Sequence, residues 1–221
     1  MLAEPERNAF EAEVRGFIGQ EATHRRIHQL FNQHLQQQGL VNAWEPRIQR
    51  RLHQLDGVTP RAWLGATAAT EHLTAILATY LLSPRCPALE GTEHRLRDLW
   101  HWHASEELEH RSTAFDLFRA VGGSEVWRRR MFFIVSFHFS ADLTRQTVNN
   151  LRRDGTLWRW STWRSGAQVL FGHDGLLRAC FGPWRRYLAA DFHPAQDDGS
   201  AGARWLADHA ALAPPVVAPG T

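Results

Sequence analysis

The chain has 221 residues, of which 43% are hydrophobic and 22% are charged, and its formal net charge is +2. This composition is typical of one globular domain and excludes a disordered chain, a collagen-like chain and a polytopic membrane protein. So small a net charge gives no general attraction for polyanions, and nucleic acid is therefore not an expected partner.

Four long helices are predicted from apolar residues that recur at steps of three and four. They cover residues 4–38, 61–82, 91–120 and 124–153, with a looser stretch over 41–58. Thr59 and Pro60 form a helix start signal, because proline is favoured at the first helical position. Gly122 and Gly123 form a stop signal after the third helix.

Shorter aromatic and basic pieces follow the fourth predicted helix. From residue 196 the sequence becomes rich in Asp, Gly, Ala and Pro, as fraying ends often are. No run alternates apolar and polar residues for long enough to build a sheet. We therefore predict an all-α four-helix bundle with short additional C-terminal helices, a single domain over residues 1–195 and a flexible C-terminal tail over 196–221.

The two cysteines, Cys86 and Cys180, are too few for a disulfide framework or a cysteine-built zinc site, and they favour a reducing compartment. The N-terminal residues carry early acids and no long apolar core, so no signal peptide is predicted. The longest apolar stretch, residues 131–139, is shorter than the roughly 20 residues that cross a bilayer. We expect a cytoplasmic protein without a spanning segment, and a peripheral membrane contact stays open.

Glutamate and histidine recur at helical spacing on the third predicted helix. His103, Glu107 and His110 are four and three residues apart, which places them on one face over two turns. Glu107 and His110 form a Glu-x-x-His motif, the spacing by which one helix presents a carboxylate and an imidazole to a shared metal. Glu106 lies on the flank of the same stripe and is a candidate general base.

The first and second predicted helices carry matching residues. Glu21 and His24 form a second Glu-x-x-His motif, and His28 continues that face one turn later. Glu71 interrupts an apolar surface, where a lone carboxylate is costly unless it is paired or bound to a cation. Together these residues have the ligand pattern of a carboxylate-bridged dinuclear site in a four-helix bundle. Oxygen and nitrogen donors without thiolate suit iron or manganese and also accept zinc.

Four motifs carry a family resemblance, and they are GFIGQEATHRRIH, TAATEHLTAILATYLL, LWHWHASEELEHRSTAFDLFRAVGG and the late DFHP. In this order they resemble the bacterial family labelled "predicted metal-dependent hydrolase", over residues 17–194. The resemblance implies a ferritin-like bundle and a helical metal-binding domain. The word hydrolase in that label is itself a prediction, so it is a weak guide to the reaction.

The ligand pattern alone is similar to that of the di-iron arylamine N-oxygenases. This resemblance implies that the ligands are Glu21, His24, Glu71, His103, Glu107 and His110. Those enzymes have a further glutamate on a helix upstream of the first Glu-x-x-His motif, and this sequence has no room for that helix before Glu21. The seventh ligand is then open among His28, Glu106, His138 and Asp142.

The leading functional prediction is a di-iron enzyme that uses O2 to oxidise a small or hydrophobic organic substrate. An external electron donor and a homodimer are compatible with it. The alternatives are a di-metal hydrolase that activates a bound water, a non-catalytic iron-binding bundle, and a bundle with internal Glu–His hydrogen bonds and no metal.

Overall fold

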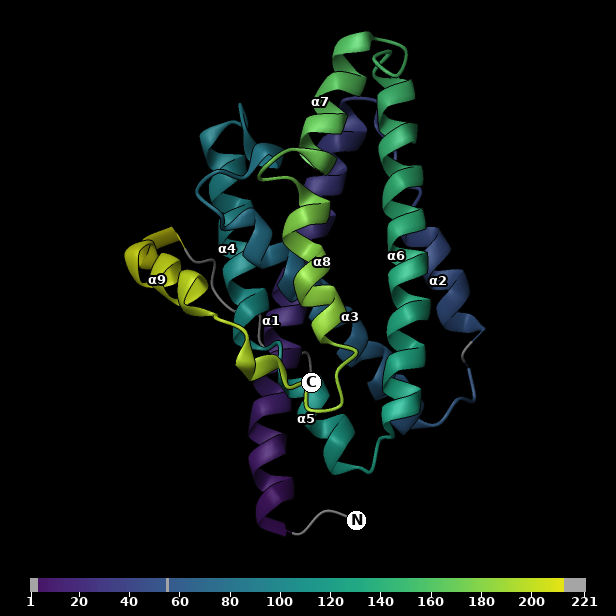
Figure 1. Ribbon diagram of the computed structural model, residues 1–221, viewed down its shortest axis with the longest axis vertical. Coiled ribbons are helices and arrows are strands. Elements are labelled where there is room, and N and C mark those ends of the chain that lie inside the picture. The colour runs from purple at the N-terminus through teal and green to yellow at the C-terminus, as the bar shows by residue number, and fades with distance from the viewer. Residues whose placement is uncertain (1–3, 55, 213–221) are drawn as a thin grey trace.

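The computed structural model describes residues 4–54 and 56–212, which form an all-α helical bundle (Figure 1). The all-α prediction is therefore confirmed. The longer helices are α1 (Glu4–Gln37), α2 (Glu45–His53), α3 (Pro60–Leu81), α4 (His94–Glu109), α5 (Thr113–Ala120), α6 (Glu125–Arg153), α7 (Trp160–Phe171), α8 (Leu176–Arg186) and α9 (Ser200–Asp208). Short 3-10 helices are η1 (Pro87–Leu89), η2 (Pro194–Gln196) and η3 (Ala210–Leu212). Among the described residues, no helix is long and apolar enough to cross a membrane.

Helix α3 lies at the centre of the bundle and packs against α4, α5, α6 and α8. Its small residues make this possible, since Ala68 and Ala69 are fully buried at the contacts. A Cβ atom on Gly65 would lie 2.8 Å from Cδ1 of Trp127 on α6, so glycine is required for this close approach. The helix begins as predicted, because the Thr59 hydroxyl accepts a hydrogen bond from the Ala62 amide.

The predicted third helix is interrupted, and the prediction of one continuous helix over residues 91–120 is wrong. Helix α4 ends at Glu109 and α5 begins at Thr113. Between them, the Arg111 guanidinium donates hydrogen bonds to the carbonyls of Leu108, Pro194 and Asp197. These bonds satisfy a carbonyl at the end of α4 and fix the turn. The apolar periodicity continues across the break, and this is why the sequence pattern does not reveal it.

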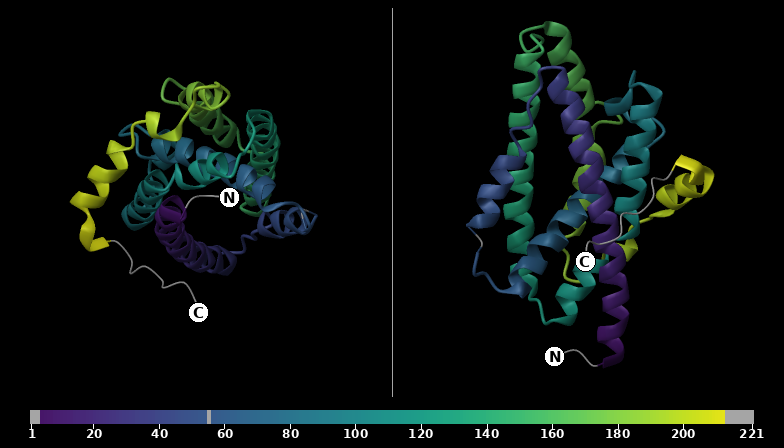
Figure 2. Two further views of the ribbon diagram at one scale, coloured as in Figure 1. Left: turned by 90° about the horizontal axis from the view of Figure 1, so that it is seen from below. Right: turned by 180° about the vertical axis from the view of Figure 1, so that it is seen from behind.

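Helix α1 crosses the back of the molecule beside α4, whereas α6, α7 and α8 form a layer on the opposite side (Figure 2). The core on the α6 side includes Phe115, Phe132 and Tyr187. Arg128 is also fully buried there, with its guanidinium carbon 4.7 Å from the centre of the Tyr187 ring. It donates a hydrogen bond of 2.7 Å to the Ala189 carbonyl, and this contact ties α6 to the segment after α8.

Two segments that the sequence analysis treated as irregular contain helices. Helix α2 lies in the stretch predicted to be loose, and α9 occupies residues 200–208, where a flexible tail was predicted. Helix α9 packs against α4, and a Cβ atom on Gly202 would lie 3.1 Å from the Ser105 carbonyl oxygen. The small residues that suggested a tail are therefore used for close packing. Residues 213–221 of the predicted tail lie outside the described residues.

Candidate metal centre

Helices α1, α3 and α4 bring most of the predicted ligands together in one largely buried cluster. Each of Glu21, His24, Glu107 and His110 offers a donor atom, and these four atoms all lie within 4.8 Å of one another. The convergence follows from the helical spacing, because residues three and four apart share one helix face. His110 is the exception, since it caps the end of α4 at the break before α5.

His24 is almost completely buried, and its two ring nitrogens have different surroundings. Its Nε2 donates a hydrogen bond of 3.0 Å to Oε2 of Glu106. Its Nδ1 lies 3.4 Å from both Glu21 Oε1 and Glu107 Oε1, but it forms no hydrogen bond. One nitrogen is thus fixed by Glu106, an outer carboxylate, while the other faces Glu21 and Glu107, which we call the inner carboxylates.

His110 repeats this arrangement on the other side of Glu21. Its Nδ1 donates a hydrogen bond of 3.1 Å to Glu71 Oε2, while Nε2 lies 3.7 Å from Glu21 Oε1 and is buried without a hydrogen bond. Metal-binding histidines usually donate their second ring N–H to a carboxylate in this way. The two buried nitrogens without hydrogen bonds, together with the inner carboxylates, fit a divalent cation.

The pKa values of the cluster reflect carboxylates gathered in a buried place. Burial opposes the charged form of His24, but the neighbouring carboxylates of Glu106, Glu107 and Glu21 outweigh it and raise the pKa of His24 to about 11. Burial likewise opposes ionisation of Glu107, but His24 and His103 lower its pKa to about 2. Burial raises the pKa of Glu71, and His110 offsets this only in part. The cluster therefore needs positive charge, which a proton or a cation can supply.

His103 and His28 extend the cluster along α1 and α4. His103 Nε2 lies 3.5 Å from Glu107 Oε1, and burial lowers the pKa of His103 to about 3, so its imidazole is neutral. Its ring centre is 4.4 Å from that of His24 and 4.8 Å from that of His28. His28 is exposed and is not among the four residues that converge within 4.8 Å, although the sequence pattern predicts it as a ligand.

The two candidates on α6 do not join the cluster. Asp142 is fully buried, and its carboxylate accepts hydrogen bonds from Arg47 and Arg51 of α2. It is therefore neutralised by two guanidinium groups of α2. The His138 ring packs against the ring of its neighbour Phe137, with 5.5 Å between ring centres. Of the four candidates for the seventh ligand, only Glu106 lies in hydrogen-bond contact with a predicted ligand.

Two aromatic side chains that the sequence analysis did not assign to the site cover its imidazoles. The Phe17 ring packs edge-on against His110, with 4.9 Å between ring centres, and Trp102 packs against His24 at 5.5 Å. Phe17 precedes Glu21 by four residues, so the same helical spacing that indicates the ligands also places Phe17 on their face. No such spacing indicates Trp102, because it is adjacent to His103 in sequence and adjacent residues do not share a helix face.

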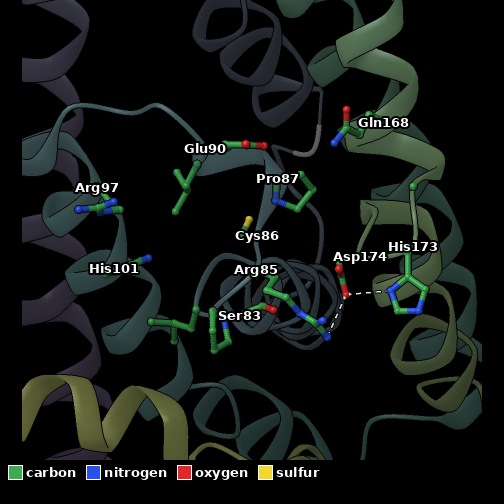
Figure 3. A pocket seen from close by; sticks show the side chains of 14 residues that line it. Ser83, Arg85, Cys86, Pro87, Glu90, Arg97, His101, Gln168, His173 and Asp174 are labelled. Atoms are coloured by element: carbon green, nitrogen blue, oxygen red, sulfur yellow. Dashed lines mark hydrogen bonds and ion pairs between the residues drawn. The ribbon is translucent and has the colours of Figure 1, made fainter.

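A separate pocket of about 690 Å³ lies between η1, α4 and the end of α7 (Figure 3). None of the predicted metal ligands lines it. Its side chains include Arg85, Arg97 and Glu90, and Asp174 forms ion pairs there with Arg85 at 3.6 Å and His173 at 3.2 Å. The pocket is therefore distinct from the Glu/His cluster.

Comparison with known proteins identifies a family for most of the chain. A family model described as "Predicted metal-dependent hydrolase" matches residues 2–198, a range that contains every predicted ligand. No curated protein and no solved structure matches the chain significantly. A metal requirement is thus the functional property that the comparison and the Glu/His cluster have in common.

Proposed function

The chain belongs to the family of predicted metal-dependent hydrolases. We propose that its Glu/His cluster binds two iron ions and uses O2 to oxidise a small or hydrophobic organic substrate. The observation that carries the proposal is the position of two inner carboxylates. Glu21 contacts both His24 and His110, and Glu107 contacts both His24 and His103. Carboxylates shared between imidazoles in this way suit a pair of bridged cations.

The ligands divide into two sides around the inner carboxylates. His110 and Glu71 would hold one ion, His24 and His103 would hold the other, and Glu21 and Glu107 would serve both. Two ferrous ions would supply the electrons that activate O2, and an external donor would restore them. Phe17 and Trp102 would keep water from the imidazoles. Glu106 would accept the hydrogen bond from His24 Nε2 and so fix the orientation of the His24 ring.

A second candidate is a hydrolase that uses a metal-activated water. Two observations favour it, namely the family description and the convergence of only four donors within 4.8 Å. In this arrangement, Glu21, His24, Glu107 and His110 would hold one ion, and Glu71 and Glu106 would orient the imidazoles. Zinc and manganese would then suit the site as well as iron.

Metal content distinguishes the two candidates. We expect about two iron ions per chain when the protein is purified without oxygen from iron-replete cells, as the shared carboxylates require. Elemental analysis by plasma mass spectrometry gives the number, and an oxygen electrode shows whether O2 is consumed when a reductant is added. One zinc or manganese ion per chain, with no uptake of O2, would instead support the hydrolase.

Replacing Glu106 with glutamine tests whether this residue orients His24 or transfers protons itself. If it orients the ring, we expect metal affinity to fall by about 10–100-fold, as is usual when an outer partner of a metal-bound histidine is lost. Titration of the metal-free protein with Fe(II) under nitrogen gives the affinity. Glu109→Gln is a matched control, because Glu109 is exposed on the same helix and contacts Gln20. Unchanged affinity with lost activity would identify Glu106 as a proton-transfer group.

A further inference from the structure

Helices α6, α7 and α8 form a layer on the side of the molecule opposite α1 (Figure 2). Large apolar side chains of these helices, and of the segment between α6 and α7, are exposed. We call this surface the aromatic face, and its main residues are Phe133, Phe137, Trp158, Trp160, Phe171 and Phe181. Trp158 is 87% exposed and Trp160 is 80% exposed. Exposed rings gathered over three neighbouring helices are unusual for a surface that contacts only water.

Ring contacts join the part of the aromatic face that lies on α6 and α8. Trp184 of α8 packs against Phe133 of α6, with 5.5 Å between ring centres, and stacks on Phe181 at 6.4 Å. On α7, Trp160 and Phe171 are eleven residues apart, which places them within about 20° of each other around the helix. Neither α7 nor α8 contains a buried residue, so both helices lie at the surface of the molecule.

Positive charge is concentrated in the same part of the chain. Residues 125–186, from the start of α6 to the end of α8, contain eleven arginines, three aspartates and one glutamate, although the net charge of the whole chain is only +2. The rest of the chain is therefore net negative. One of the three aspartates, Asp142, is buried and paired with arginines of α2. Exposed arginines adjoin the rings in sequence, as Arg159 lies between Trp158 and Trp160 and Arg164 follows Trp163.

We propose that the aromatic face docks on the surface of an anionic lipid bilayer. Tryptophan and phenylalanine rings settle in the headgroup region, and adjacent arginines bind lipid phosphates. A second copy of the chain is a poor occupant, because its own face would bring arginines against arginines. The protein then binds from one side without crossing the membrane, in agreement with the absence of a spanning helix among the described residues.

Co-sedimentation with vesicles tests the proposal on the full chain. The probes are vesicles of phosphatidylcholine alone and of an equal mixture of phosphatidylcholine and phosphatidylglycerol. We expect at least about tenfold tighter binding to the mixture, weakened by salt, because each arginine near an anionic surface contributes about fivefold in affinity. Equal binding to both kinds of vesicle, or binding to neither, would overturn the proposal, and the wild-type protein alone suffices for this test.

Variants locate the contact on the aromatic face. Trp158→Ser with Trp160→Ser should weaken binding to the mixed vesicles by at least about tenfold, since both rings leave the interface. Arg159→Gln with Arg164→Gln should weaken it by about 25-fold. The matched control is Ile48→Ser with Arg50→Gln, an exposed apolar residue and an exposed arginine on α2, and it should bind as the wild type does.

Two further results would assign the face to another occupant. A dimer in solution that Trp158→Ser with Trp160→Ser dissociates would show that a second copy covers it. Tighter binding to duplex DNA than to the mixed vesicles would show a nucleic-acid surface. All the variant positions are exposed, so circular dichroism should show unchanged helix content.

Discussion

Replacing Glu107 with alanine is expected to leave the chain folded but almost free of metal. Its carboxylate lies 3.4 Å from His24 Nδ1 and 3.5 Å from His103 Nε2, so two imidazoles lose their shared partner. The loss of affinity should exceed the roughly 10–100-fold that follows when only an outer partner of a ligand is removed. Plasma mass spectrometry after gel filtration gives the metal content of the variant.

Thermodynamic linkage provides a second readout for the same variant. When free metal is about 1,000 times its Kd, binding raises the free energy of unfolding by about 4 kcal/mol, and a 100-fold weaker variant gains about 1.4 kcal/mol. Urea unfolding with and without metal measures this difference. Glu109→Ala, on an exposed position of the same helix, should keep the full gain. Wild-type metal content in Glu107→Ala would contradict the proposed centre.

The second large effect is expected on stability, from Asp142→Asn. Asp142 is fully buried and pairs with Arg47 and Arg51, whose side chains are 21% and 28% exposed. Breaking a fully buried ion pair costs about 3–5 kcal/mol, and partial exposure of both arginines should reduce the cost to about 2–3 kcal/mol. The free energy of unfolding in urea at neutral pH measures it, and Asp154→Asn at an exposed position is the control.

This stability difference should depend on pH. Burial opposes ionisation of Asp142, but Arg51 and Arg47 outweigh it and lower its pKa. The ionised carboxylate therefore stabilises the fold fully above the unfolded-state pKa of about 3.9, and the contribution is lost as the pH falls below that value. The wild type and Asp142→Asn should thus converge in acid. A difference that stays constant from pH 7 to about pH 3 would contradict this explanation.

Helical periodicity predicted the main elements and the gathering of the acidic and imidazole groups. Glu21 and His24 on α1, and Glu107 on α4, converge because a helix fixes which residues share a face. The roles of the individual carboxylates could not be predicted in this way. Glu71 and Glu106 each accept a hydrogen bond from an imidazole, and this depends on how far apart the helices lie.

The features that the sequence did not predict all depend on contacts between distant segments. The break after Glu109 is fixed by Arg111, which reaches carbonyls of Pro194 and Asp197. Helix α9 forms where composition suggested a tail, because Gly202 allows it to pack on α4. Asp142 has the spacing of a ligand on an inward helix face, but α2 supplies its arginine partners from a segment predicted to be irregular.

In the proposed metal centre, the position of His110 at the interrupted end of α4 would also affect the kinetics of ion exchange. The backbone at a helix end opens locally more readily than the backbone in the middle of a helix, so a ligand at a helix end is held by a less stable part of the element. The Arg111 hydrogen bonds to Leu108, Pro194 and Asp197 hold the turn after Glu109 closed. We therefore expect local opening of residues 110–112 to speed the dissociation of an ion bound by His110, and amide hydrogen exchange of these residues measures that opening.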